Sequence, residues 1–313
     1  MWRLARGWGS RGARGWGARR GPLTVAAAPA SGGPGSWYER LAQSSAVHWA
    51  EDGLVALQAA AGLPWWAAIV CGAALLRTAV TLPLAAHQSR LLAKLENLQP
   101  EIKKLAECLR YEVSVRGKQV GWSKKAARFH FKKNLRRIIT ELYVRDNCHP
   151  FKATLVMWVQ LPMWVCVSLA LRNCSVGAAD PEVQEQFSAG GALWFTDLTA
   201  PDSTWILPVS LGLVNLLIVE VFALPKMKVS RFQKFVTNFF RVVSVVMIPV
   251  AATVPSSMAL YWLSSSCVGL SHNLLLRSPT FRRLCRIPRT SSDSATPYRD
   301  IVSALTARYG FKK

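Results

Sequence analysis

The most constraining feature of the sequence is an apolar run, LPWWAAIVCGAALLRTAVTLPLAA at residues 63–86, that contains one full charge. A membrane-spanning helix needs about 20 apolar residues at about 1.5 Å each, so this run is long enough to cross a bilayer. Arg77 lies about 13 Å below the nearer end of the run. An arginine at that depth is expensive and usually faces a partner or a water-filled cavity. The run therefore predicts a membrane span with a functional charge.

One face of this predicted helix continues the polarity of Arg77. Residues three or four positions apart share a helix face. The positions on this face are small at one end and hydrogen-bonding at the other: Ala73, Ala74, Arg77, Thr81 and Gln88. We interpret the stripe as one wall of a hydrophilic groove, with Arg77, Thr81 and Gln88 as candidate binding residues.

Composition places the chain among membrane proteins. Its 313 residues are 51% hydrophobic and carry a net charge of +22, a combination that is rare in soluble domains. A polytopic membrane protein with basic loops explains both properties. Basic charge can also indicate nucleic-acid binding, but here it is divided between apolar spans rather than gathered in one region. We therefore expect no specific nucleic-acid partner.

Four further apolar segments follow the first run. They cover residues 153–171, 206–224, 235–254 and 256–276, and the last two are close enough to form a tight helical hairpin. With residues 63–86 they predict an all-α polytopic membrane protein in which five transmembrane helices surround the groove.

The long loop at residues 88–149 is basic and periodic. It holds fifteen Lys or Arg against six Asp or Glu. Its apolar residues repeat in steps of three and four, which predicts two antiparallel helices with a turn within residues 117–123. Pro100 is interpreted as a kink or as the start of a new helix. The charge itself is also explained as a topology determinant that binds anionic lipid. The periodic residues are Leu91, Leu95, Leu98, Ile102, Leu105 and Leu109, then Leu135, Ile138, Ile139 and Leu142.

Loop charges predict the orientation. The long loop, residues 225–234 and the tail at 277–313 are basic, whereas residues 172–204 hold one basic residue and five acids. By the positive-inside rule the basic segments lie on the negative side of the membrane and the N-terminus on the opposite side; in a mitochondrial inner membrane these sides are the matrix and the intermembrane space. The hairpin and the tail are therefore expected on the matrix side of the inner membrane.

The segment before the first span has two parts. Residues 1–36 are rich in arginine and lack lysine and acids, which is typical of a mitochondrial transit peptide; a basic disordered tail is the alternative. Residues 37–62 have helical spacing of apolar positions and predict an amphipathic segment on the intermembrane-space side. Asn173-Cys174-Ser175 is a glycosylation sequon, so a glycan there would indicate secretory targeting instead.

Other polar residues fall inside the predicted spans. Gln160, Asn215 and Glu220 are further candidate groove residues. The alternatives are interhelical hydrogen bonding for Asn215 and the serines of the last span, and a mutual ion pair between Glu220 and Arg241. The last span contributes a polar run: Ser264, Ser265, Ser266, Ser271, His272 and Asn273.

Residue patterns for catalysis or metal binding are missing from the sequence. It has no phosphate-binding glycine loop, no HExxH or GxSxG, and no CxxC among its seven cysteines. Cys148 and His149 are adjacent but lack two further ligands nearby. We expect no enzyme activity, no catalytic residue, no metal and no cofactor.

Several motifs together resemble one known family. The Arg-bearing span, the basic hairpin, 160-QLPMW-164, 194-WFTDLTAPDSTWILP-208 and 255-PSSMALYW-262 resemble the YidC/Oxa/Alb3 membrane insertases over about residues 63–276. The stretches 97-NLQPEI-102 and 141-ELYVRDNCHPFKA-153 are similar to its mitochondrial branch that assembles cytochrome c oxidase. The resemblance implies a groove open to the matrix and the lipid. In it, Arg77 is the groove arginine and Gln160 belongs to the Gln-hydrophobic-Pro motif.

The resemblance also implies a function. An insertase moves a hydrophilic client segment to the intermembrane space while a neighbouring apolar segment enters lipid. For this branch the implied client is the C-terminal part of cytochrome c oxidase subunit 2; other complex IV assembly factors and membrane lipid are implied partners, with weak ribosome contact. The alternatives are a solute or proton transporter, which the lack of an internal repeat disfavours, and an assembly factor that holds its client without translocating it.

Overall fold

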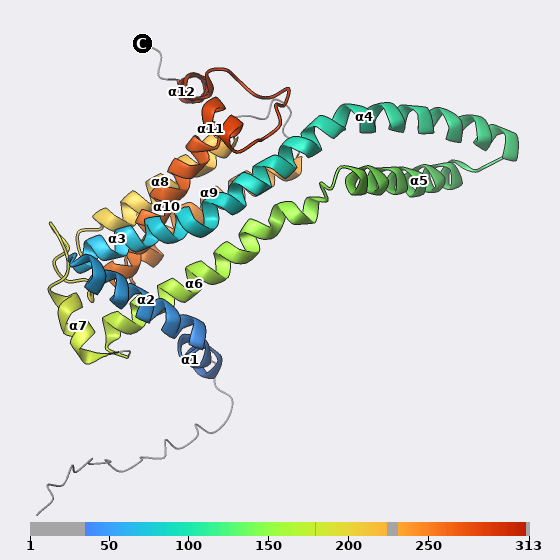
Figure 1. Ribbon diagram of the computed structural model, residues 1–313. Coiled ribbons are helices and arrows are strands. Elements are labelled where there is room, and N and C mark those ends of the chain that lie inside the picture. The colour runs from blue at the N-terminus through green and yellow to red at the C-terminus, as the bar shows by residue number, and fades with distance from the viewer. Residues whose placement is uncertain (1–34, 179, 224–230, 311–313) are drawn as a thin grey trace, which may run out of the picture.

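The structure is a computed structural model that describes residues 35–178, 180–223 and 231–310, and it is built from helices (Figure 1). Within these residues there is no strand, only two isolated β-bridges. The expected transit peptide, 1–36, lies outside the described residues except for its last two. The helices are α1 (Gly35–Ala42), α2 (Ser45–Ala61), α3 (Trp65–Leu76), the π-helical turn η1 (Arg77–Thr81), α4 (Leu82–Val120), α5 (Lys124–Arg145), the 3-10 turn η2 (Pro150–Thr154), α6 (Leu155–Val176), α7 (Pro181–Ser188), α8 (Ile206–Ala223), α9 (Arg231–Ala251), α10 (Ser256–Leu275), α11 (Pro279–Leu284) and α12 (Pro297–Tyr309).

Four helical segments are long and apolar enough to cross a membrane. They are Trp65–Val120, Pro150–Val176, Ile206–Ala223 and Lys234–Ala251. Their outer faces carry large exposed apolar side chains, such as Leu213 of α8 and Phe239 of α9, as expected of helices that face lipid. The prediction of an all-α polytopic membrane protein is confirmed.

Helix α10 is as long as a span but more polar. Its serines, His272 and Asn273 lower its hydropathy, so it is not among those four segments. Ten of its twenty residues are buried, because α3, α6 and α8 pack around it. Some of its polar groups bond to neighbouring helices, as where Trp262 Nε1 donates to Ser168 Oγ at 2.9 Å, and others bond to carbonyls of α10 itself, as where Ser264 Oγ donates to the Leu260 carbonyl. A helix enclosed in this way does not need an apolar surface all round.

The first predicted span begins a much longer helical run. Helix α3, the turn η1 and α4 follow one another without a break from Trp65 to Val120. Pro83 lies inside this run, directly after the π-helical turn, and its missing N–H removes one hydrogen bond from the continuous helix. Pro100 lies inside α4, so the helix continues through it and does not restart there.

Helices α4 and α5 form a hairpin that projects from the bundle (Figure 1). Gly121 ends α4 in the left-handed conformation, φ 70°, and Ser123 Oγ caps α5 by accepting from the amide of Ala126. Leu98 and Leu142 are buried between the two helices. The same cluster holds Leu91 and Cys148, with Leu95, Ile102, Leu105, Ile138 and Tyr143 packed against it. These residues include most of the apolar repeat in the sequence.

Helices α1, α2 and α7 gather at the end of the bundle opposite the hairpin (Figure 1). Asn173, near the end of α6, donates from Nδ2 to Glu51 Oε1 at 2.7 Å and to the Ala42 carbonyl at 2.9 Å. Arg172 donates to the hydroxyl of Tyr38 at 2.7 Å. Asn173 is only 8% exposed, so its amide is committed to packing. A glycan on this residue would break both of its hydrogen bonds.

The C-terminal segment folds back onto α4. Ile287 is buried against Ala86 and Ala93 of α4. Asn97 Nδ2 donates to the carbonyl of Arg289 at 3.0 Å, and Glu96 Oε1 accepts from the Ser292 amide at 3.2 Å. We call residues 285–293 the C-terminal strap. The strap and α5 hold different faces of α4 at the base of the hairpin.

Candidate functional site

The site is centred on Arg77, at the first position of the π-helical turn. Its Nε donates to Ser265 Oγ of α10 at 2.8 Å. Gly269, one turn further along α10, lies so close that a Cβ there would be 2.7 Å from Arg77 Nη1. Helix α10 therefore offers the guanidinium a hydroxyl and a space without a side chain.

Arg77 has no carboxylate partner among residues 35–178, 180–223 and 231–310. None of the ion pairs in these residues includes it. Glu220, the acid that sequence placed inside a nearby span, is held by Arg241 instead, with Oε1 2.7 Å from Nε. The positive charge of Arg77 is thus met by a neutral hydroxyl, in a half-buried position.

Further polar groups surround this contact. Thr78 Oγ1 lies 3.2 Å from His272 Nε2, and Tyr261 is buried next to Ser265. Residues 261, 265, 269 and 272 repeat at helical spacing along α10. The sequence carried part of this signal, because the polar run of the last span, with Ser265 and His272, could line the groove opposite Arg77 or bond to other helices. We call Arg77, Thr78, Tyr261, Ser265 and His272 the polar cluster.

The π-helical turn alters the predicted stripe. A π turn takes up about one extra residue compared with an α turn, and such turns are frequent at functional sites. Positions beyond it are therefore rotated by about 100° relative to a uniform α-helix. Thr81, which is buried, lies in the same turn as Arg77. Gln88 lies further along α4 and makes no side-chain hydrogen bond to the polar cluster within the described residues.

The other three candidate groove residues are Gln160, Asn215 and Glu220. Within the described residues, none of them makes a hydrogen bond or an ion pair with Arg77. Gln160 is half-buried on α6. Asn215 Oδ1 accepts from Ser266 Oγ at 2.9 Å, which is an interhelical bond between α8 and α10. Glu220 pairs with Arg241 across α8 and α9. For Asn215 and Glu220 the structure thus shows the packing contacts that were the alternative.

One cavity lies between α2, α3 and α6. Its volume is about 510 Å³, and its lining is apolar except for a few groups such as Tyr261. Arg77 is not part of that lining, although its neighbour Leu76 is. This cavity is therefore distinct from the hydrophilic groove expected around Arg77.

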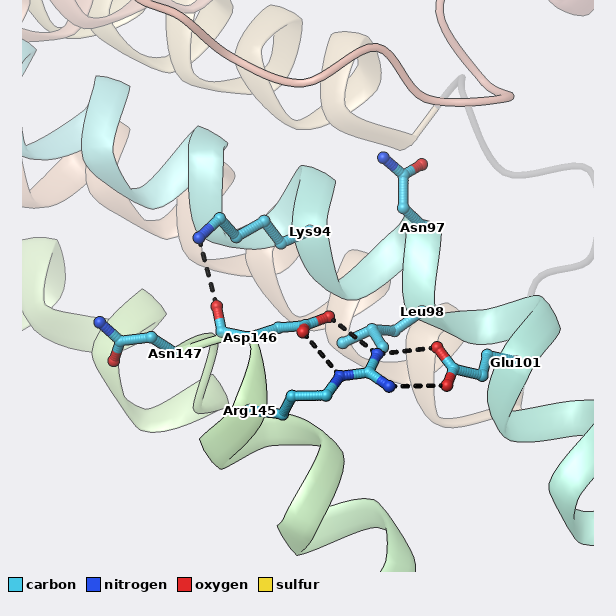
Figure 2. A pocket seen from close by; sticks show the side chains of 7 residues that line it. All are labelled: Lys94, Asn97, Leu98, Glu101, Arg145, Asp146 and Asn147. Carbon is cyan, nitrogen blue, oxygen red and sulfur yellow. Dashed lines mark hydrogen bonds and ion pairs between the residues drawn. The ribbon is translucent and has the colours of Figure 1, made fainter.

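A second cavity, of about 480 Å³, lies at the base of the hairpin (Figure 2). Arg145 donates to both carboxylate oxygens of Glu101 at 2.9 Å and to Asp146 Oδ1 at 2.9 Å. Lys94 Nζ donates to the carbonyl of Asp146 at 3.2 Å. Arg145 holds the pKa of both carboxyl groups below their ordinary values. Because these charged groups neutralise one another, the residues around the cavity serve to hold α4 and α5 together.

No arrangement in the described residues points to a metal. No group of three or more His, Cys, Asp or Glu side chains is placed to hold an ion there. Cys148 is buried in the hairpin cluster, and burial raises the pKa of its thiol. His149 instead accepts from the amide of Phe151 at 3.2 Å.

Comparison with known proteins places the chain in a family. Residues 56–282 match the model of the 60Kd inner membrane protein family. The mitochondrial cytochrome c oxidase assembly protein COX18 of Mus musculus is 62% identical over 295 residues, which is 93% of this chain and 89% of that protein. Its counterpart in Homo sapiens is 62% identical over 280 residues, 88% of this chain and 84% of that protein.

A more distant relative matches as well. The mitochondrial inner membrane protein OXA1 of Arabidopsis thaliana is 32% identical over 246 residues, 78% of this chain and 53% of that protein. The resemblance seen in the sequence is confirmed, and together with the apolar helices these relatives identify a mitochondrial membrane protein. The chain belongs to the 60Kd inner membrane protein family, which is the YidC/Oxa/Alb3 family of membrane insertases.

Proposed function

We propose that this chain is an insertase of the mitochondrial inner membrane that acts in cytochrome c oxidase assembly. It inserts client segments and exports hydrophilic tails to the intermembrane space, and its main client is the C-terminal part of cytochrome c oxidase subunit 2. Relatives at 62% identity bear the name of cytochrome c oxidase assembly proteins, which supports this choice. The observation that carries the proposal is Arg77: a charge in a membrane helix that bonds to Ser265 and, among the described residues, to no carboxylate.

The physical task is to lower the cost of moving a polar segment through lipid. Polar and charged residues are expensive in hydrocarbon unless they find partners. Arg77 offers an acidic client residue an opposite charge, and Thr78 and Ser265 offer hydroxyl groups beside it. Each negative charge that moves toward the positive outer side also gains about 2.3 kcal/mol per 100 mV of membrane potential. Export therefore needs no nucleotide site.

The proposed orientation places the hairpin and the C-terminus in the matrix, and helices α1 and α2 in the intermembrane space. It includes α10 as a fifth span beside the four apolar ones. The charge alternation of the loops supports it. The arrangement in Figure 1 supports it too, because the basic hairpin and α11–α12 lie at one end of the bundle and α1, α2 and α7 at the other.

The client path runs along the polar cluster. We assign client contact to Arg77 and Thr81, and to two further polar residues, Gln88 of α4 and Gln160 of α6. Asn215 and Glu220, which the sequence also suggested, hold α8 to α10 and to α9 in this assignment.

The decisive experiment follows the tail of newly made subunit 2 in mitochondria with and without this protein. Protease added from the intermembrane-space side cleaves an exported tail and spares a retained one. We expect cleavage in the presence of the protein and protection in its absence. Cleavage in both cases would mean that the protein holds subunit 2 without exporting it.

A separate reconstitution distinguishes the transporter alternative. The purified chain in sealed vesicles is given labelled anions and no client. We expect no uptake above that of empty vesicles, because the chain would act on polypeptide segments. Saturable uptake that Arg77→Ala abolishes would identify a transporter.

A further inference from the structure

We propose that the cavity between α2, α3 and α6 binds one acyl chain of a membrane phospholipid. The cavity shares only Tyr261 with the polar cluster, and the inference does not depend on the insertase function. It rests on the lining, the volume and the access of this space.

The lining is made by small and apolar residues. Helix α2 contributes Ala46, Ala50 and Gly53, and α3 contributes Gly72 and Ala73. A Cβ added at Gly53 would have no atom within 4 Å, so the helices do not close on each other there. Apolar cavities of this kind stay dry and take up apolar ligands.

The volume fits one chain. An apolar cavity of about 150 Å³ accepts benzene, which corresponds to about 25 Å³ per carbon. By that measure the cavity, at about 510 Å³, holds about 20 carbons. One long acyl chain fills this space and two do not, so the second chain of the same lipid stays in the bilayer.

The route of access to the cavity indicates which kind of apolar ligand it binds. Two walls, α3 and α6, belong to segments long and apolar enough to cross a membrane. Leu75 lines the cavity and is 58% exposed, so the space is continuous with a surface that lipid covers. Trp49, on the amphipathic helix α2, also lines the cavity and is 78% exposed. Tryptophan side chains favour the membrane–water boundary. A lipid chain can enter sideways while its headgroup stays at that boundary.

The cavity has a different chemistry from the proposed client path. A client's polar tail would find no ion-pair partner there, because the lining holds no charged side chain. Tyr261 is the link between the two regions, since it lines the cavity and belongs to the polar cluster. A bound chain would therefore exclude water from the apolar side of Tyr261.

The test uses a phospholipid with a photoreactive diazirine at the end of one acyl chain. The full chain is reconstituted in vesicles that contain this lipid, irradiated, and its peptides are mapped by mass spectrometry. We expect adducts to concentrate on residues 46–57 and 163–171. Gly53→Phe should reduce the number of adducts several-fold, because the new side chain fills the cavity. Ala46→Leu should reduce the number of adducts less, because Ala46 lies at an exposed position of the lining.

The matched control is Val55→Phe, on the same helix but outside the lining, which should leave the adducts unchanged. Adducts spread evenly over lipid-facing residues such as Leu213, and unaffected by both filling variants, would overturn the proposal. The proposal would also be overturned if a photoreactive amino acid placed at position 49 in place of Trp49 captured newly made client and no lipid. The cavity would then be a client-binding site. Both readouts are independent of tail export.

Discussion

Arg241 donates from Nε to Glu220 Oε1 at 2.7 Å, across the interface of α8 and α9. This contact gives the buried Glu220 a cation that is not Arg77. Neutralising the Glu220 carboxylate is the main structural role that Arg77 could have had. Arg241 already performs that role. The consequence can be measured by removing each arginine in turn.

Replacing Arg77 by Ala should leave the protein abundant and stop the export of an acidic client tail. The substitution removes a charge that meets only the Ser265 hydroxyl, so it strands no carboxylate among the described residues. Arg77→Lys should keep partial activity, because it retains the charge and loses the planar fork. Steady-state level and protease accessibility of the subunit 2 tail, measured in the same cells, check both variants.

Arg241→Ala is the comparison for that experiment. It deprives Glu220 of this ion pair, and breaking a fully buried pair costs about 3–5 kcal/mol, with less expected here because Arg241 is partly exposed. Its abundance should fall where that of Arg77→Ala does not. Normal export by an abundant Arg77→Ala protein would remove Arg77 from the mechanism, and a loss of abundance equal to that of Arg241→Ala would make its role structural.

Replacing Leu98, Ile102 and Leu105 by Ser should open the hairpin while the membrane helices remain folded. Leu98 is 3% exposed in the cluster with Leu142, and truncation of a buried leucine costs about 2–5 kcal/mol. Limited proteolysis should cut α4 and α5 faster, and crosslinking of client should fall. Leu92→Ser, at an exposed position of the same helix, is the control. Unchanged client crosslinking in an opened hairpin would mean that only its charge matters.

The apolar pattern predicted this hairpin because burial between two helices requires a repeat of three and four residues. The same reasoning predicted apolar helices, of which the structure has four long enough to cross a membrane, and did not reveal the strap. The strap binds α4 through one buried apolar side chain, Ile287, and through the carbonyls of Cys285 and Arg289, which every residue type possesses. A contact made by backbone atoms leaves no trace in side-chain periodicity.

Of the polar residues within the bundle, Glu220 was given its correct partner, Arg241, as one alternative. Other buried polar groups were not assigned partners from the sequence. Asn173 and Glu51 lie 122 residues apart in sequence, and a single hydrogen bond joins them. Composition shows that a buried amide needs a partner and cannot say which one. The π turn was missed for a related reason, since the segment Arg77–Thr81 reads as ordinary apolar helix in sequence.

Asp202 should make the protein more stable at neutral pH than in acid. Its carboxylate is 4% exposed and accepts from the amides of Thr204 and Leu207 at 3.0 and 2.8 Å, at the start of α8. Burial alone would raise the pKa of this carboxyl, but these bonds and that of the Thr204 hydroxyl outweigh it and hold the pKa below the ordinary value. The stabilisation is therefore complete above the unfolded pKa of about 3.9 and is lost as pH falls through the lower folded value.

The variant that tests this is Asp202→Asn. Its melting temperature in detergent should be lower than that of the unmodified chain at neutral pH, and the difference should close below about pH 4. Asp52→Asn, at an exposed position of α2, is the control variant. If the melting temperatures of Asp202→Asn and the unmodified chain differed by the same amount at every pH, the charge of Asp202 would contribute nothing to stability.

Replacing Ile287 by Ser should release the C-terminal strap. Ile287 is buried against Ala86 and Ala93, so the change removes the apolar contact that holds the strap to α4. Trypsin should then cleave after Arg286 and Arg289 several-fold faster. Val302→Ser, at an exposed position of α12, should leave the cleavage rate unchanged. Equal rates for Ile287→Ser and the unmodified chain would show that hydrogen bonds alone hold the strap.

The unbroken run from Trp65 to Val120 has a mechanical consequence. Its 56 residues form a lever about 84 Å long at about 1.5 Å per residue. The strap and α5 clamp this lever near its middle, so a sideways load on the tip of the hairpin turns it about a fixed point. Helices bend where a proline or a π turn interrupts their regular hydrogen bonds. Pro100 is such a point on the distal arm of this lever, and the turn that carries Arg77 is such a point on the membrane side of the clamp, so bending at that turn would change the position of the one charge of the first span.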